Sequence, residues 1–207
     1  MASVEASDII GIPIPATFTK DGKTVNHEIA YRPGNINFSP DMVNVPIHVL
    51  SLNSSVLDDA CSALSQNTPD LSGSIVLIRL SEACSDYEQA EILAPHNPKG
   101  VMWYLNPAVN VLNPWSSFNY PVGVITEQAG KTIIETIAAG GKVSLSFPET
   151  DRYVVMPYVY GGIGSFWSSW GGLWDLTLKP EIAAVSLLSQ TDGELASGTK
   201  TYTNSKI

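Results

Sequence analysis

The stretch "PDLSGSIVLIRLSEACSDYE", residues 69–88, predicts the order of the elements at the centre of the fold. It opens with turn-forming residues and then places four apolar residues in succession, Ile75–Ile78, which is typical of a buried strand. Ser85 and Glu88 have the spacing of a capping box, S-x-x-E, so a helix is expected to begin there. Pro95 ends that helix, because proline cannot continue one. The stretch therefore predicts a strand followed by a short helix.

Strands and one further helix are predicted on both sides of this stretch. Apolar runs and apolar alternation predict strands at 43–52, 100–105, 120–126, 142–147 and 152–162. Residues 127–139 have helical periodicity, with Ile133, Ile134 and Ile137 on the inward side. Residues 1–35 are extended, with a turn at Asp21-Gly22. This order predicts a mixed α/β domain packed around one sheet.

Composition excludes several classes of protein. The chain has 207 residues, of which 44% are hydrophobic and 15% are charged, so it is expected to fold around a sizeable core. Its net charge of −9 argues against nucleic acid as a partner, because phosphates attract Lys and Arg. There is no run of 18 apolar residues that would cross a membrane. The first fifteen residues lack the basic and apolar regions of a signal peptide.

The two cysteines, Cys61 and Cys84, leave two interpretations open. They are either two buried thiols or one disulfide that spans 23 residues. No histidine or further cysteine lies at ligand spacing beside them, and no glycine-rich phosphate loop or HExxH motif is present. Neither a metal nor a cofactor is therefore expected. Two sequons, at Asn37 and Asn53, are candidate glycosylation sites and suit a secreted protein.

Residues 69–84 resemble the start of a protease-associated (PA) domain, in which a block P-D-L-x-G-x-I-V-L-I-x-R-G-x-C leads into a helix. Arg79 and Cys84 match this block, whereas the connection between them is one residue longer and lacks its Gly. The resemblance continues through "KGVMWYLNP" and "YPVGVITEQAGKTIIETIAAGGKVSLSF" and covers roughly 40–148. It implies a β-sandwich or open barrel flanked by short helices, within the mixed α/β class.

The same resemblance implies a pairing for the cysteines. In secreted subtilases of fungal type, a cysteine just upstream of P-D-L pairs with the cysteine of the block. Cys61 stands at that upstream position, so the resemblance implies a disulfide between Cys61 and Cys84.

A second block, "GSFWSSWGGLWDLTLKPEIAAV" at 164–185, is similar to the segment that leads from an inserted PA domain back into the core of a subtilisin-like protease. That segment reads S-S-F-x-S-W-G-P-T-x-D-L-x-L-K-P-E-I-A-A-P-G-G. The residues that match it include Phe166, Ser169, Trp170, Gly171, Lys179, Pro180 and Glu181. "ASVEA" at 2–6 looks like the strand that precedes the insertion. The chain as a whole thus resembles the PA segment of a secreted subtilase of the peptidase S8 family.

The resemblance divides the chain into four parts. These are an N-terminal arm from the subtilase core, the PA domain, the return strand and a divergent tail, at 1–35, 36–150, 151–185 and 186–207. Further departures lie in the last two parts: Trp167 is inserted, Gly172 replaces a Pro, and the P-G-G after Ala184 is missing. Lys200 stands where the nucleophilic Ser of "G-T-S-M-A" belongs.

In such proteases the catalytic Asp and His precede the PA insertion and the Ser follows it. The chain therefore lacks a recognisable triad and is expected to be catalytically inert alone, although the parent family consists of serine endopeptidases. The implied role is accessory to proteolysis, through substrate access or recruitment of protein and peptide substrates, outside the cell. Tryptophans that lose their burial partners would also favour self-association.

Two alternatives stay open. A stand-alone extracellular interaction module would use the loop 106–120, where Trp115 and Phe118 either anchor a partner or pack on the sheet. A nonfunctional gene fragment is the other alternative. The histidines lie outside any catalytic motif and are expected at or near the surface: His27, His48 and His96. Asp58 and Asp59 are expected to be solvated, and two adjacent carboxylates alone make a poor Ca²⁺ site.

Overall fold

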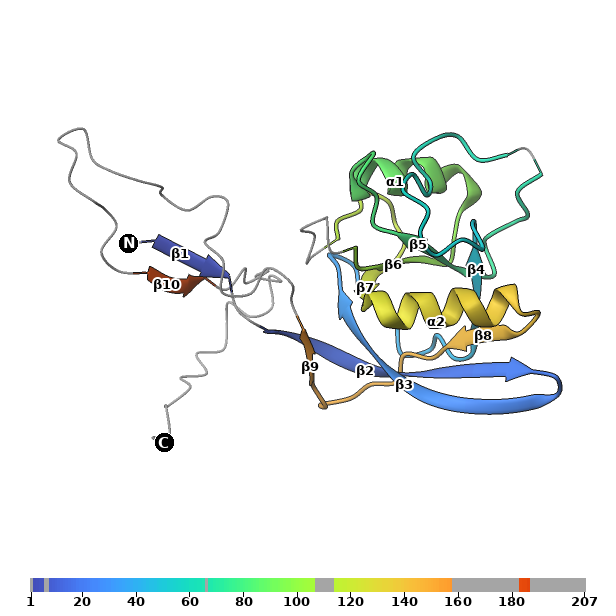
Figure 1. Cartoon of the computed structure of the whole chain (residues 1–207), viewed down its shortest axis with the longest axis horizontal. Helices are drawn as coiled ribbons and strands as arrows, with labels where there is room; N and C mark the ends of the chain where they lie inside the picture. Colours follow the sequence, from blue (N-terminus) through green and yellow to red (C-terminus); the bar gives the residue numbers. More distant parts are fainter. Residues whose placement is uncertain (1, 6–7, 66, 107–113, 158–182, 187–207) are drawn as a thin grey trace. The chain divides into compact units, whose positions relative to one another are not determined.

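The computed structural model describes residues 2–5, 8–65, 67–106, 114–157 and 183–186 of the chain. It divides into two compact units, one of Ala6–Ile163 and one of Met1–Glu5 with Gly164–Ile207 (Figure 1). In the second unit, the strands β1 (Ala2–Glu5) and β10 (Ala183–Ser186) pair in parallel, with Ala2 opposite Ala183.

The larger unit is a closed β-barrel flanked by two helices. Its strands are β2 (Asp8–Lys20), β3 (Lys23–Pro33), β4 (Val45–Val49), β5 (Ile75–Arg79), β6 (Gly100–Tyr104), β7 (Val122–Ile125), β8 (Lys142–Leu145) and β9 (Val154–Pro157). Seven of them form the ring β3-β7-β6-β5-β4-β8-β2, which closes because β2 also pairs with β3. Neighbours from β4 to β7 are parallel, and β9 pairs with the start of β2. The predicted mixed α/β class, a barrel with short helices, is confirmed.

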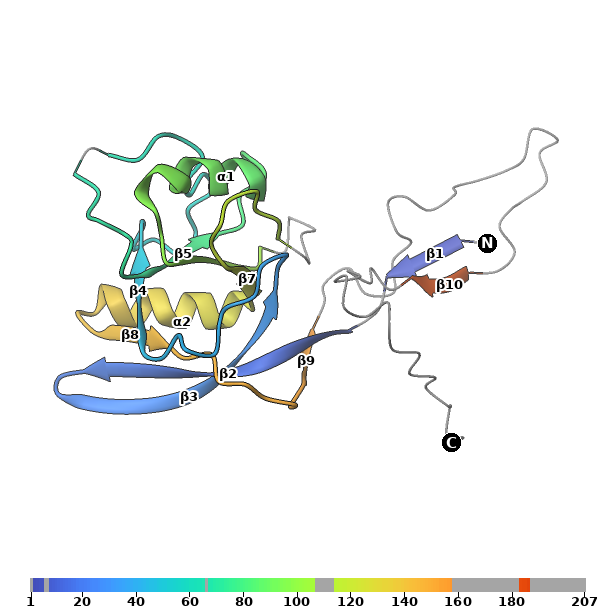
Figure 2. The same cartoon turned by 180° about the vertical axis from the view of Figure 1, so that it is seen from behind.

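The continuous apolar run of β5 is explained by two cores, one on each face of the strand. Ile75 and Leu77 face the barrel interior, whereas Val76 and Ile78 face the opposite side, and all four are buried. Helix α1 (Asp86–Leu93) covers the outer face, and helix α2 (Glu127–Ala138) contributes to the inner core. Figures 1 and 2 show the two helices on opposite sides of β5 and β6. Alternation with period two thus supplies both cores from one strand.

Local signals place both helices where the sequence predicts them. Ser85 caps α1: its Oγ accepts from the Glu88 N–H at 3.2 Å, and the Glu88 carboxylate accepts from the Ser85 N–H at 2.8 Å, so the predicted capping box is formed. A 3-10 turn, Ala94–His96, follows α1 and contains Pro95. Thr126 caps α2 in the same way, by accepting from the Ala129 N–H at 3.2 Å.

The N-terminal residues are placed differently from the four-part division. Residues 8–33, which that division assigns to an arm, form the long hairpin β2–β3 and supply two of the barrel's strands. Asp21 and Gly22 make its two-residue turn with φ of 50° and 72°, and positive φ at both positions is typical of the type I′ turns that join such hairpins. The hairpin is therefore part of the barrel core, through Ile14 and Ala16.

No helix in the described part of the chain has the length and apolar character needed to cross a membrane.

Candidate functional site

A disulfide joins Cys61 and Cys84, with their Cα atoms 5.7 Å apart. The pairing that the PA resemblance implies is confirmed, and the alternative of two buried thiols is excluded. The bond links the loop before β5 to the turn that leads into α1. Ser81 holds the same turn, because its hydroxyl donates to the Leu57 carbonyl at 2.7 Å and accepts from the Ala83 N–H at 2.9 Å. The loop is therefore tied to the barrel by both covalent and hydrogen bonds.

A buried polar network lies beneath this loop. The side-chain amide of Gln89, on α1, donates to the carbonyl oxygens of Asp59 and Arg79. Its oxygen accepts from the indole N–H of Trp103 at 2.9 Å, so Gln89 is fully buried with its polar atoms paired. This single side chain joins the loop, β5, α1 and β6.

Arg79 and Asn106 extend the network to the ends of β5 and β6. The guanidinium of Arg79 donates to the Val56 carbonyl at 3.1 Å and to Oδ1 of Asn106 at 3.1 Å. The Asn106 amide in turn donates to the Leu80 carbonyl at 3.0 Å. Arg79 matches the Arg of the PA block, and here its contacts fix the shape of the loop around Val56.

Asp59 corrects one expectation, because it is not solvated. Its side chain is only 6% exposed and accepts from the Arg79 N–H at 3.1 Å. Burial, with a smaller contribution from the neighbouring Asp58, raises the pKa of Asp59 to about 6. No local pattern in the sequence distinguishes it from Asp58, which is exposed. The Asp59 carboxylate therefore faces the barrel and does not join Asp58 in binding a cation at the surface.

No group of three or more metal-ligating side chains occurs among the described residues. The three histidines lie apart, on β3, on β4 and in the 3-10 turn. His27 is exposed and packs edge-on against Phe18, with ring centroids 5.4 Å apart. Burial lowers the pKa of His48. Within the ranges that the structure describes, none of the three is hydrogen-bonded to a Ser, a Thr or a carboxylate.

Trp115 and Phe118, the two candidate anchors in the loop 106–120, have different surroundings in the structure. Trp115 is 50% exposed and stacks on Tyr87 of α1, with ring centroids 5.8 Å apart and planes 20° apart. Its backbone N–H donates to the Asp86 carboxylate at 3.1 Å. Phe118 instead stacks on Tyr120 and packs against the outer core. Of these two residues only Trp115 has a half-exposed ring, and that ring stacks on helix α1 and not on the sheet.

Both candidate glycosylation sites, Asn37 and Asn53, are exposed, so glycosylation stays a prediction. The residues that match the subtilase return segment lie outside the described residues: Phe166, Ser169, Trp170, Gly171, Lys179, Pro180 and Glu181.

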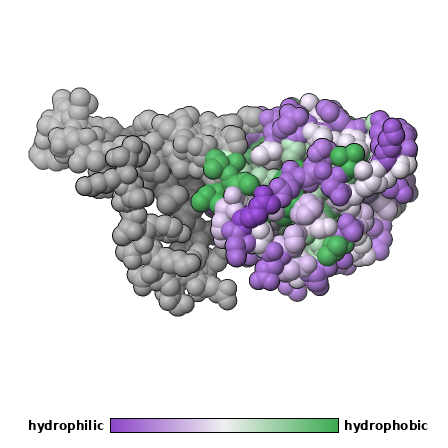
Figure 3. All heavy atoms as spheres, turned by 90° about the horizontal axis from the view of Figure 1, so that it is seen from below, coloured by the Kyte–Doolittle hydropathy of each residue, from purple (hydrophilic) through white to green (hydrophobic). Residues whose placement is uncertain are grey.

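The first and the last strand of the larger unit, β2 and β9, each carry an exposed large apolar side chain. Ile10 on β2 and Val155 on β9 are opposite each other in the ladder and are 61% and 68% exposed. Figure 3 shows exposed apolar side chains (green) within the mostly hydrophilic surface of the barrel. Such a pair is suited to burial by another surface.

No family model and no curated protein matches the chain. Solved structures to which part of it is similar include BSAP, a zinc aminopeptidase from Bacillus subtilis, with 18% identity and a TM-score of 0.41 over 72% of this chain. A peptidase M28 precursor from Shewanella amazonensis SB2B has 10% identity and a TM-score of 0.45 over 72% of this chain. The psychrophilic subtilisin-like protease Apa1 from Pseudoalteromonas sp. AS-11 has 15% identity and a TM-score of 0.41 over 77% of this chain. The matches span 35%, 38% and 40% of these proteins, respectively.

Proposed function

We propose that the barrel is a protease-associated domain inserted into a secreted subtilisin-like serine endopeptidase, and that it is accessory to proteolysis and inert alone. The observation that carries the proposal is the parallel pairing of β1 with β10, two strands that lie on either side of the whole barrel in the sequence. Parallel neighbours need a crossover connection, and here the connection contains a complete domain.

The β1–β10 pair is too small to be stable by itself. Each strand has four residues, and two short strands in isolation are marginal in water. Sheets made of parallel strands alone occur almost only where helices cover both faces. The pair is therefore expected to continue into a larger parallel sheet, as in an α/β catalytic core. Strand β1 lies within "ASVEA", and β10 begins with the last two residues of "LKPEIAA"; these segments resemble the two borders of the insertion.

Two further features support this placement. Ile10 and Val155 are exposed apolar side chains of the kind that another protein surface buries. The disulfide suits an oxidising compartment, and extracellular location is part of the proposal. In this role the barrel shapes the access of protein and peptide substrates to the protease.

The purified chain tests inertness. We expect no hydrolysis of a fluorogenic peptide and no labelling by a fluorophosphonate probe, with an active subtilisin-like protease as the positive control. Turnover that the probe abolishes would overturn the proposal. Sequencing of the genomic DNA that flanks the coding region tests the insertion directly. Reading frames with Asp and His blocks upstream and a G-T-S-M-A block downstream are expected.

A second candidate function is a stand-alone interaction module, and the half-exposed ring of Trp115 on Tyr87 favours it. Flanking DNA without protease blocks would support this alternative. Self-association through tryptophans is a related proposal, which sedimentation of the full chain at several concentrations tests.

A further inference from the structure

Strand β3 loses one of its two neighbours before its hairpin ends. It pairs with β7 only at Tyr31, Arg32 and Pro33, whereas it pairs with β2 down to Lys23. Among the described residues, no strand pairs with the other edge of residues 23–30. The first six of these eight residues are exposed. This edge therefore presents backbone N–H and C=O groups that have no ladder partner in the described part of the chain.

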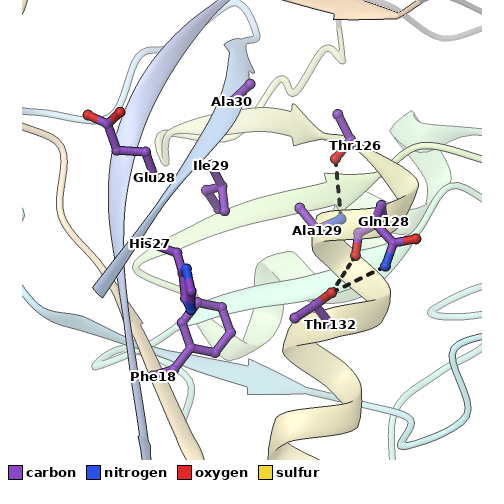
Figure 4. A pocket seen from close by; sticks show the side chains of 9 residues that line it. All are labelled: Phe18, His27, Glu28, Ile29, Ala30, Thr126, Gln128, Ala129 and Thr132. Carbon is purple, nitrogen blue, oxygen red and sulfur yellow. Dashed lines mark hydrogen bonds between the residues drawn. The ribbon is translucent and has the colours of Figure 1, made fainter. Parts of the chain in front are cut away.

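The edge is free because the neighbouring chain turns into a helix. Strand β7 ends at Ile125, and Thr126 immediately caps α2. The space where β7 would continue beside β3 is thus left between β3 and the first turns of α2. A groove with a volume of about 320 Å³ occupies this position and is lined by both elements (Figure 4).

The lining follows the alternation of the strands. Phe18, His27 and Ile29 share one face of the hairpin, and in Figure 4 their side chains lie on the groove side, opposite Ala129 and Thr132 of α2. In the same view the side chain of Glu28 points away from the helix. The wall is therefore largely apolar, with hydroxyl and amide groups on the helix side.

The charged groups beside the groove are already paired. Glu28 forms a bidentate ion pair with Arg152, at 2.7 and 3.1 Å. Glu127 pairs with Lys131 at 2.7 Å. A segment that enters the groove meets no unpaired carboxylate or ammonium group among the lining residues, so its inward side chains are expected to be uncharged.

We propose that this groove binds an extended peptide segment, which adds as a strand to the free edge of β3. Backbone hydrogen bonds to residues 23–30 supply affinity, and alternate uncharged side chains enter the space between Ile29 and Ala129. The size of the site indicates which kind of molecule can occupy it. Eight residues of strand extend about 27 Å, and one such edge buries far less than the roughly 1,600 Å² that a stable protein–protein interface needs. The occupant is therefore a peptide segment and not a second folded copy.

This inference does not depend on a protease host, so the full chain alone tests it. The probe is a fluorescein-labelled octapeptide, Thr-Val-Gln-Val-Thr-Val-Gln-Lys, acetylated and amidated at its ends. Two N-methylated versions of the peptide are the chemical controls. Each version lacks the backbone N–H donors along one edge of the extended peptide and keeps those along the other edge. Strand addition predicts saturable fluorescence anisotropy that one N-methylated version loses and the other retains, because only one edge of the peptide faces β3.

Variants on α2 locate the site. Thr132→Tyr fills the groove from an exposed position and is expected to weaken binding at least about tenfold. Glu135→Tyr is the matched control, since Glu135 is exposed on the same helix but does not line the groove. Hydrogen exchange should slow at residues 24–30 when the peptide is bound. Failure to bind at 1 mM peptide, equal loss in both variants, protection confined to other elements, or dimerisation through this edge would overturn the proposal.

Discussion

The carboxylate of Asp59 accepts a hydrogen bond of 3.1 Å from the backbone N–H of Arg79, the last residue of β5. Asp59 belongs to a loop, yet it is buried against the end of a core strand. Desolvation disfavours its charged form and raises its pKa from 3.8 to about 6, although the hydrogen bond from Arg79 acts in the opposite direction. The carboxylate that anchors the loop therefore makes the stability of the folded domain depend on pH.

The first prediction concerns Asp59→Asn, which keeps the acceptor oxygen and removes the charge. Because the folded-state pKa lies above the unfolded value, the contribution of Asp59 is fully present below about pH 4 and is lost as pH rises through about 6. The shift corresponds to about 3 kcal/mol of unfolding free energy. Urea unfolding should therefore show that the free energy of unfolding falls more between pH 4 and pH 7 for the wild type than for Asp59→Asn. Exposed Asp58→Asn should retain most of the wild-type decline, because Asp58 makes only a smaller contribution to the raised pKa of Asp59 and burial makes the largest one. Parallel profiles for all three proteins would contradict the prediction.

The second prediction concerns the disulfide. Replacing Cys61 and Cys84 with alanine removes a link that spans 23 residues, which the chain-entropy model values at about 3–4 kcal/mol. Chemical unfolding should show a loss of that order. A reductant should lower the stability of the wild type to that of the double variant and leave the variant unchanged. If the reductant lowers both equally, its effect does not act through this bond.

The elements with local signals could be predicted from the sequence. The run Ile75–Ile78, the capping box at Ser85 and the turn at Asp21-Gly22 each form as predicted, because a few neighbouring residues determine them. The disulfide was predicted from a family resemblance, since two cysteines alone left their pairing open.

Pairings between distant residues could not be predicted in this way. The apolar alternation of residues 10–14 indicates a strand but does not identify β8, at 142–145, as a neighbour of β2. The family resemblance assigns residues 1–35 to an arm, although residues 8–33 form two strands of the barrel. Burial of Asp59 and Gln89 depends on contacts between the loop, β5 and α1, and polar residues in a loop and on a short helix give no signal of it.

The third prediction concerns Gly130, where α2 packs directly on β6. A Cβ at this position would lie 2.3 Å from Cβ and Cγ of Tyr104, a fully buried residue. Alanine normally favours a helix over glycine by about 1 kcal/mol. Here overpacking, which costs about 1–3 kcal/mol, should outweigh that gain, so Gly130→Ala is expected to lower the thermal midpoint. Gly73→Ala is the control, because nothing lies within 4 Å of its added Cβ. An increase in stability for Gly130→Ala would show that α2 is not packed this closely.

The last prediction separates a binding role of Trp115 from a structural one. Its ring is 50% exposed and stacks on Tyr87, which is itself exposed. Trp115→Ala should therefore lose about 0.5–1.5 kcal/mol of stacking, together with the burial of half the ring, and leave the barrel folded. Trp103→Phe is the contrast, because Trp103 is fully buried and its indole N–H pairs with Gln89. Leaving that buried acceptor without its donor costs about 1–3 kcal/mol, to which the lost ring volume adds. Thermal unfolding followed by circular dichroism compares the two variants. Unfolding of Trp115→Ala at 25 °C would assign the ring to the core and remove the observation that favours a stand-alone interaction module, whereas a folded variant keeps Trp115 available as an anchor for a partner.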